Sequence, residues 1–195
     1  MMGKWIFICG PSGVGKDSLI AWSRHALAGQ PHIVFARRLV TRAAQSGSDD
    51  DAMSEDDFLS LRQSGGLHWH WQAHGFYYGI SQNYASHVSS GRAVVINGSR
   101  SHVDALPASS DIKRVEITAS PDKIATRLAQ RGRDSEEAVT HRLARNAGFA
   151  QISSSSADLI IRNDADIAQA GAALVTYLAV QADINVTLTP PITSA

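Results

Sequence analysis

Cysteine is almost absent from the 195-residue chain, which contains a single one, Cys9. One cysteine excludes a disulfide framework within the chain and fits a reducing compartment. Net charge is absent too, because 18 basic residues balance 18 acidic ones. Proteins that bind nucleic acid or membrane surfaces are usually clearly basic, so the sequence predicts neither kind of partner.

Long apolar stretches are also missing, since no run approaches the roughly 20 residues that span a bilayer. A predicted strand begins within four residues of the start, which leaves no room for a signal peptide. We therefore expect a cytoplasmic protein. With 44% hydrophobic and 18% charged residues, the composition is that of an ordinary globular domain with a substantial core.

One stretch near the start does point to a specific chemistry. An apolar run at residues 4–9 precedes it, and a predicted helix at 16–28 follows. Glycines let a backbone curl so that several N–H groups face one anion, and the helix adds the positive end of its dipole. The sequence therefore predicts a loop that binds nucleotide phosphates. Its residues are Gly10, Pro11, Ser12, Gly13, Val14, Gly15, Lys16, Asp17 and Ser18.

The residue after the lysine is unusual for such a loop. Phosphate-binding loops normally have Ser or Thr there to meet magnesium, whereas this chain has Asp17 followed by Ser18. A carboxylate is a good magnesium ligand, so either side chain is a candidate. The alternative is that Asp17 is an ordinary acid at a helix start, favoured by the helix dipole.

Strands alternate with helices along the chain, which predicts an α/β fold with a parallel sheet. We expect one domain over 1–182, with its core at about 1–36 and 91–182 and a loose tail at 183–195. The segment from about 37 to 90 breaks the alternation and is expected to be an inserted substrate lobe. In and before it we expect a strand at 32–40, a loop at 43–52, a helix at 54–63, a strand at 67–73 and then an edge strand.

Arginines form two groups. Arg37, Arg38 and Arg42 lie at the end of a predicted strand and suit phosphate oxygens, which guanidinium groups bind in a bidentate way. A second group lies in the predicted lid, about 127–146: Arg127, Arg131, Arg133, Arg142 and Arg145. Some members of both groups are expected to be ordinary surface residues. The histidines at 68, 70 and 74 are expected to be ordinary lobe residues rather than metal ligands, because no cysteine or spaced carboxylate completes a set.

These motifs make the chain similar to nucleoside-monophosphate kinases of the guanylate kinase type, over roughly residues 3–180. The segments that match in order and spacing are 10–16, Thr41-Arg42, Tyr77-Tyr78-Gly79, 127–145 and Asn163-Asp164. The resemblance implies a three-layer P-loop fold, in which a parallel sheet core has an inserted substrate-binding lobe and a lid.

The chain departs from the guanylate kinase pattern at several positions. His68 stands where that family has the glutamate that reads guanine, and Asn97 replaces an aspartate at a strand end. The segment 50–52 replaces a tyrosine that contacts the GMP phosphate. A site without its base-reading carboxylate loses specificity for that base.

The remaining motifs resemble a narrower family, the ribose 1,5-bisphosphate phosphokinases of bacterial phosphonate degradation. They are Lys16-Asp17-Ser18, Arg38-x-x-Thr41-Arg42, Trp71-x-Ala73-His74-Gly75-x-Tyr77-Tyr78-Gly79 and Asn97-Gly98-Ser99-Arg100. The resemblance implies transfer of the ATP γ-phosphoryl group to ribose 1,5-bisphosphate, with Mg²⁺, to give 5-phosphoribosyl 1-diphosphate. A guanylate kinase and a non-catalytic module of the same shape are the alternatives, and a homodimer is compatible with the sequence.

This resemblance also implies roles for individual residues. The loop and Lys16 would bind ATP, and Asp17 or Ser18 would hold the magnesium ion. The residues expected to hold the ribose bisphosphate are Arg38, Arg42, Tyr78, Asn97 and Arg100, the last two at a strand's carboxyl end, where ligands of parallel sheets bind. Arg131 and Arg142 would clamp the transferring group, and Asn163 would contact the adenine by analogy.

Overall fold

A five-stranded parallel sheet forms the centre of the protein, in a computed structural model that describes residues 2–43, 50–130 and 157–185. The strands lie in the order β2-β7-β1-β8-β9, and every neighbouring pair is parallel. Their bounds are β1 Lys4–Cys9, β2 Ile33–Phe35, β7 Ala93–Asn97, β8 Ile112–Thr118 and β9 Leu159–Arg162. This architecture confirms the predicted α/β class.

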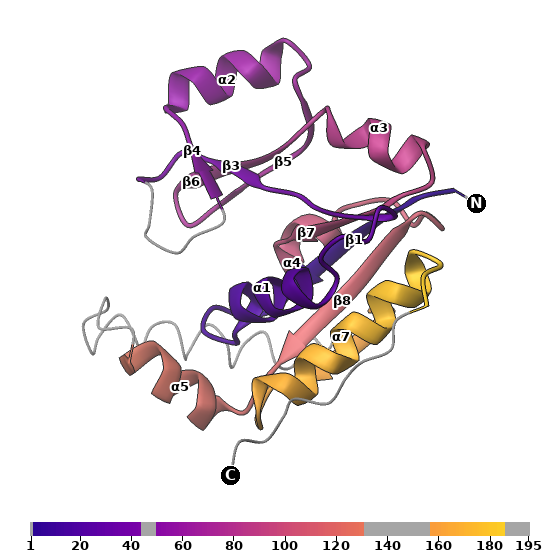
Figure 1. The fold of residues 1–195 in the computed structure, drawn as a ribbon. Helices are drawn as coiled ribbons and strands as arrows, with labels where there is room; N and C mark the ends of the chain where they lie inside the picture. Colours follow the sequence, from indigo (N-terminus) through magenta and orange to yellow (C-terminus); the bar gives the residue numbers. More distant parts are fainter. Residues whose placement is uncertain (1, 44–49, 131–156, 186–195) are drawn as a thin grey trace.

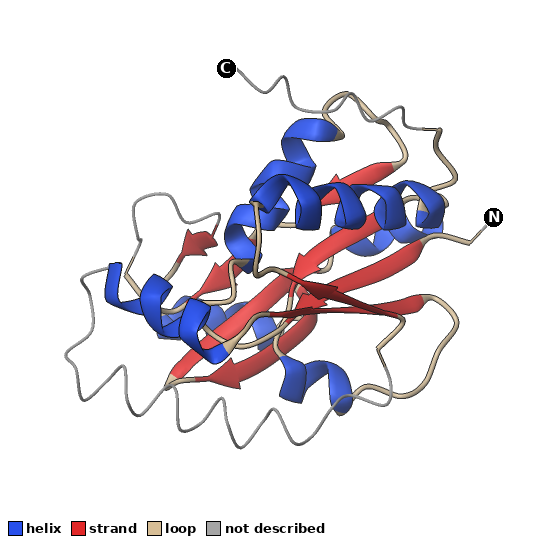
Figure 2. Ribbon diagram, turned by 90° about the horizontal axis from the view of Figure 1, so that it is seen from below, coloured by secondary structure: helices blue, strands red, loops and turns tan. Residues whose placement is uncertain are grey.

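The apolar sequence of β1 reflects a sheet that is covered on both faces (Figure 2). Successive strand residues point to opposite faces, so Ile6 and Ile8 lie in one core while Trp5 and Phe7 lie in the other. The first core is closed by α1 (Lys16–Ala26) and α7 (Ile167–Gln181). The second core is closed mainly by residues of a smaller sheet.

The smaller sheet has four strands in the order β4-β3-β6-β5. Its strands are β3 Arg38–Val40, β4 Asp50–Ala52, β5 Leu67–Ala73 and β6 Phe76–Ser81. The neighbouring residues Tyr77 and Tyr78 of β6 lie on opposite faces of this sheet. Tyr77 stacks on Phe58 of α2 (Glu55–Gln63), with ring centroids 5.5 Å apart, while Tyr78 belongs to the core shared with the main sheet. The small sheet therefore lies between α2 and the main sheet (Figure 1).

The other described helices are α3 Tyr84–Ser89, α4 Arg100–Asp104 and α5 Pro121–Gln130. In the described ranges, no helix combines the length and the apolar character that a bilayer crossing requires. Nearly all of the expected lid lies outside the described residues.

Three local predictions are wrong. The run 32–40 forms two strands in different sheets. Its first part pairs with β7, and the Ala36 N–H still donates to the Val95 carbonyl oxygen; the chain then leaves the main sheet and pairs with β4. The expected loop at 43–52 ends in a strand, since Asp50–Ala52 pairs with β3 although acidic residues are poor strand formers. Finally, β6 is internal rather than an edge strand, being flanked by β3 and β5.

Gly171 of α7 packs directly against Trp22 of α1. A Cβ atom there would lie 2.6 Å from two ring carbons of Trp22. Gly→Ala in a helix normally stabilises by about 1 kcal/mol. We expect Gly171→Ala instead to lower the free energy of unfolding by about 1–3 kcal/mol, through overpacking against the indole ring.

Urea denaturation checks this prediction, with Ala173→Gly at an exposed position of the same helix as the control for helix propensity. The control is expected to lose about 1 kcal/mol. A more stable Gly171→Ala protein would contradict the described contact between the two helices.

Candidate functional site

The predicted phosphate loop joins the carboxyl end of β1 to the start of α1. Gly10, Gly13 and Gly15 all have left-handed backbone angles, with φ of 143°, 84° and 95°. The loop also lies directly against β8, because a Cβ on Gly10 would be 2.3 Å from the carbonyl oxygen of Ile117. Glycine is therefore required at position 10 by both conformation and space.

The underside of the loop is held by two side chains from later in the chain. The carbonyl oxygen of Val14 accepts hydrogen bonds from Asn163 Nδ2 at 2.8 Å and Arg127 Nη1 at 3.2 Å. Arg127 Nη2 also donates to the Asn163 carbonyl at 2.9 Å. With only 3% of its surface exposed, Asn163 supports the loop from beneath, and its predicted adenine contact stays a prediction.

Lys16 folds back over the loop. Its Nζ donates to the carbonyl oxygens of Gly10 at 2.8 Å and Pro11 at 3.0 Å. Burial lowers the pKa of Lys16 to about 8, and the positive charges of Arg38 and Arg100 act in the same direction, against the carboxylate of Asp17. Both arginines therefore lie close enough to Lys16 for their charges to act on it.

Asp17 and Ser18 lie exposed on the first turn of α1. Asn97, at the carboxyl end of β7, donates from Nδ2 to Asp17 Oδ1 at 2.5 Å. No three His, Cys, Asp or Glu side chains gather as a metal site anywhere in the described ranges. Mg²⁺ usually takes one or two protein oxygens and completes its shell with phosphates and water, so this carboxylate and hydroxyl pair fits that ion.

Arg38 and Arg42 share one carboxylate in the small sheet. Asp50 Oδ1 accepts from Arg38 Nε at 2.8 Å, and Oδ2 accepts from Arg38 Nη2 at 3.2 Å and Arg42 Nη2 at 2.7 Å. Arg38 Nη1 also donates to the Asn97 carbonyl at 3.1 Å. A continuous set of polar contacts thus joins the two arginines to Asn97, and through it to Asp17 beside the loop.

Tyr78 takes part in this site through its ring. The Arg38 guanidinium lies over the ring at 5.5 Å from the centroid. Trp71 stacks on Tyr78 at 5.6 Å, and His102 stacks on Trp71 at 4.8 Å. Burial lowers the pKa of His102 to about 4, so the imidazole in this stack is neutral near pH 7. The stacked rings of Tyr78, Trp71 and His102 therefore form a packed support for the Arg38 guanidinium.

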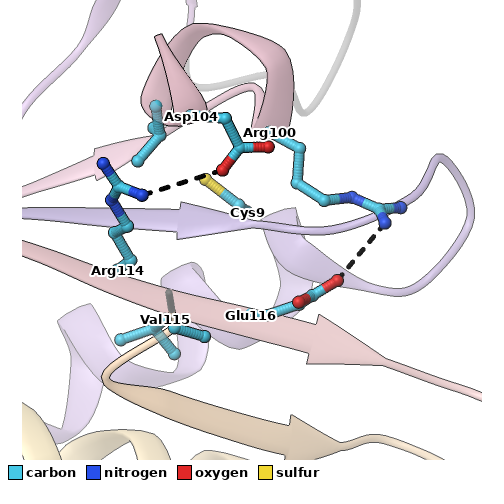
Figure 3. Close-up of a pocket in the computed structure, with 8 residues that line it drawn as sticks. Cys9, Arg100, Asp104, Arg114, Val115 and Glu116 are labelled. Carbon is cyan, nitrogen blue, oxygen red and sulfur yellow. Dashed lines mark ion pairs between the residues drawn. The ribbon is translucent and has the colours of Figure 1, made fainter. Parts of the chain in front are cut away.

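Arg100 extends past the end of β1 toward β8, where its Nη1 lies 3.3 Å from Glu116 Oε1 (Figure 3). Glu116 is 7% exposed and pairs in register with Cys9, just before the loop. Burial raises the pKa of Cys9 to about 12, which makes that thiol unreactive at neutral pH. The structure thus directs Arg100 toward a buried carboxylate at the base of the loop.

Sequence reasoning missed two carboxylates that contact predicted site residues, Asp50 and Glu116. Glu116 had a usable signal, because it is an acid within a run of strand-forming residues, whereas Asp50 lay in a predicted loop. The ring of His68 stacks on Trp5 with centroids 4.6 Å apart, and its Nδ1 lies 3.1 Å from Gln82 Oε1. The predicted clamp residues Arg131 and Arg142 lie outside the described residues.

Comparison with known proteins finds many sequence relatives, and two of them illustrate the match. The chain is 41% identical over 182 residues to ribose 1,5-bisphosphate phosphokinase PhnN of Laribacter hongkongensis, covering 90% of this chain and 42% of that protein. It is 36% identical over 178 residues to the protein of that name from Thiobacillus denitrificans, covering 90% and 93%. The chain thus spans less than half of the first relative and nearly all of the second. No protein-family model matches the chain.

Among solved structures, guanylate kinase from Anaplasma phagocytophilum superimposes with a TM-score of 0.67, covering 92% of this chain and 86% of that one. The two sequences are 18% identical over the match, so this likeness concerns the fold. It confirms the expected guanylate-kinase-like architecture.

The support under the loop makes a prediction about stability. Asn163→Ala removes a buried hydrogen bond to Val14 and leaves a void, so we expect the free energy of unfolding to fall by about 1–3 kcal/mol. Asn83→Ala is the matched control, because Asn83 is exposed and makes no side-chain cap bond to α3. Its effect in urea denaturation should stay within about 0.5 kcal/mol. Equal stability of the two variants would contradict a supporting role for Asn163.

Proposed function

The chain belongs to the family of ribose 1,5-bisphosphate phosphokinases, and from this premise we propose that it phosphorylates ribose 1,5-bisphosphate with ATP. The bond between the γ-phosphorus of ATP and its bridging oxygen breaks, and ADP leaves. A new bond forms between that phosphorus and an oxygen of the sugar's 1-phosphate, which gives 5-phosphoribosyl 1-diphosphate. The reaction would serve phosphonate degradation.

The observation that supports this proposal most directly is the set of contacts between the loop and the paired arginines. Asp17 beside the loop bonds Asn97, whose carbonyl bonds Arg38, which shares Asp50 with Arg42. A phosphate-binding loop and a pair of guanidinium groups thereby adjoin one strand end. This arrangement suits a reaction between two phosphorylated molecules.

The acceptor's chemistry determines what the residues have to do. A phosphate oxygen is already anionic at neutral pH, so no general base is required. The protein must instead align two polyanions and offset their repulsion. The loop's N–H groups and Lys16 would bind the ATP phosphates, while Arg38 and Arg42 would bind the ribose bisphosphate above the ring of Tyr78.

Asp17 or Ser18 would hold a magnesium ion that accompanies ATP. That ion supplies further positive charge at the phosphates when it is bound. Asn97, which donates to Asp17, would fix the orientation of the carboxylate as well as contact the acceptor. Arg100, which contacts Glu116, would also contact the ribose bisphosphate.

We further propose that different segments of one domain bind the two substrates. The main sheet would serve the nucleotide, and the segment at about 37–90 would serve the acceptor. The segment at about 127–146 would close over both, with Arg131 and Arg142 against the transferring group. Asn163 would lie near the adenine while it supports the loop.

Phosphorus NMR of the protein with ATP, Mg²⁺ and ribose 1,5-bisphosphate tests the proposed reaction. We expect a diphosphate doublet from the sugar product, and Lys16→Ala should slow its appearance by at least about a hundredfold. Fast GMP phosphorylation with no turnover of the sugar would instead identify a guanylate kinase. If Lys16→Ala changes the phosphorylation rate of neither acceptor, the protein would instead be a non-catalytic binding module.

The pKa of Lys16 makes a prediction about pH. With a pKa of about 8 in the free protein, the side chain is charged below that pH and loses its proton as the pH rises through it. The ammonium form binds the phosphates, so kcat/KM for ATP should fall about tenfold per pH unit above this point. Lys16→Arg keeps its charge, so its lower kcat/KM should show no fall there. A wild-type profile that is flat to pH 10 would contradict this assignment.

A further inference from the structure

We propose that Asp50 is a positioning residue for the acceptor. Its carboxylate holds Arg38 and Arg42 in one fixed arrangement, so that the two guanidinium groups meet the sugar's phosphate as a preformed site. This inference rests on the proposed function and adds to it a residue that does not itself bind the substrate.

The geometry around Asp50 is that of a buried anchor. Its side chain is 9% exposed, against 13% for Arg38 and 27% for Arg42. Arg38 and Asp50 are register partners on the parallel strands β3 and β4. The backbone pairing therefore places the carboxylate beside Arg38, and the bidentate contact leaves that guanidinium one orientation.

Both arginines keep donors for a ligand. A guanidinium carries five N–H groups. Among contacts within the described residues, Arg38 uses Nε and one N–H on each of its other two nitrogens, while Arg42 uses one N–H on Nη2. Two positive charges also exceed the single negative charge of Asp50. The arranged group therefore still attracts a phosphate.

Preorganisation explains why a carboxylate is useful at a site for an anion. Arginine side chains have many rotamers, and a ligand that must order them binds more weakly. Here Asp50, Asn97 and the ring of Tyr78 hold Arg38 before the ligand arrives. The Arg38 side chain is thus already ordered in the folded protein, although the Asp50 carboxylate offsets part of its positive charge.

The neighbouring residue supplies a matched comparison. Asp51 pairs with Arg37 at 2.6 Å, but both side chains are about half exposed, at 48% and 47%. Exposed pairs of this kind contribute little, because solvent screens them. Asp50→Asn and Asp51→Asn make the same chemical change one residue apart, and only the first alters the anchor.

Steady-state kinetics of these variants with ATP and ribose 1,5-bisphosphate test the proposal. For Asp50→Asn we expect the KM for the sugar to rise about tenfold or more, and the KM for ATP to stay within about twofold. Asp51→Asn should match the wild type in both constants. Asp50→Glu keeps the charge but moves the carboxylate by one methylene, so it should show a smaller rise.

A double-mutant cycle shows whether Asp50 acts through Arg42. If it does, Asp50→Asn should weaken the Arg42→Met protein less than it weakens the wild type, so the two effects do not multiply. Thermal melts of every variant show whether it is folded. Should Asp50→Asn not fold, Asp50→Glu decides the question through the same KM comparison.

Several results would overturn the proposal: a sugar KM in Asp50→Asn equal to that of Asp51→Asn, a fall in that KM, or effects that multiply fully in the cycle.

Calorimetric binding of ribose 5-phosphate separates this inference from the proposed reaction. If the wild type binds this probe and Asp50→Asn binds it at least about tenfold more weakly, the positioning role stands even where no turnover is seen. Equal affinities would refute it, and a wild type without turnover would refute the reaction alone.

Discussion

The close contact between the phosphate loop and β8 is the constraint on which the rest of the site depends. A side chain at Gly10 would collide with the Ile117 carbonyl, so the loop can take this path only with glycine there. Asn163 and Arg127 then hold the Val14 carbonyl from beneath. Because β1, β7 and β8 are parallel neighbours, their carboxyl ends and the side chains that follow them meet at one edge of the sheet.

Alternating charges organise that edge. Lys16 and Asp17 are neighbours in the chain, and Asn97 connects Asp17 with Arg38, which shares Asp50 with Arg42. On the other side, Arg100 meets the buried Glu116. Each cation is thereby held near an anion or a carbonyl before any phosphate arrives. In the proposed transfer of a phosphoryl group between two polyanions, such fixed positive charge would lower the barrier more effectively than mobile surface charge.

The loop and the parallel sheet could be predicted because their signals are local. Glycines, a lysine and an apolar strand lie within about twenty residues, and each has a direct physical meaning. The family motifs likewise assign Arg38, Arg42 and Tyr78 to one substrate. In the structure Arg38 lies over the ring of Tyr78 and shares a carboxylate with Arg42, while their role in binding stays a prediction.

The anchoring carboxylates could not be predicted in the same way. Asp50 contacts Arg38 because β3 and β4 pair in one register, and Glu116 lies beside Cys9 because β8 pairs with β1. Such contacts arise from strand pairing across distant segments, which side-chain periodicity does not encode. For the same reason the pattern of 32–40 predicts a single strand, because nothing in it shows that the chain changes sheets after Ala36.

We expect donor and acceptor phosphates to meet between the loop and the arginine pair that Asp50 holds. A crystal structure with a non-hydrolysable ATP analogue, Mg²⁺ and ribose 1,5-bisphosphate tests it most directly. The nucleotide phosphates should lie on the N–H groups of the loop, and a sugar phosphate should lie within hydrogen-bond distance of Arg38 and Arg42, with Asp50 still bound to both. A sugar bound elsewhere, or an Asp50 carboxylate displaced from both arginines by the phosphate, would contradict it.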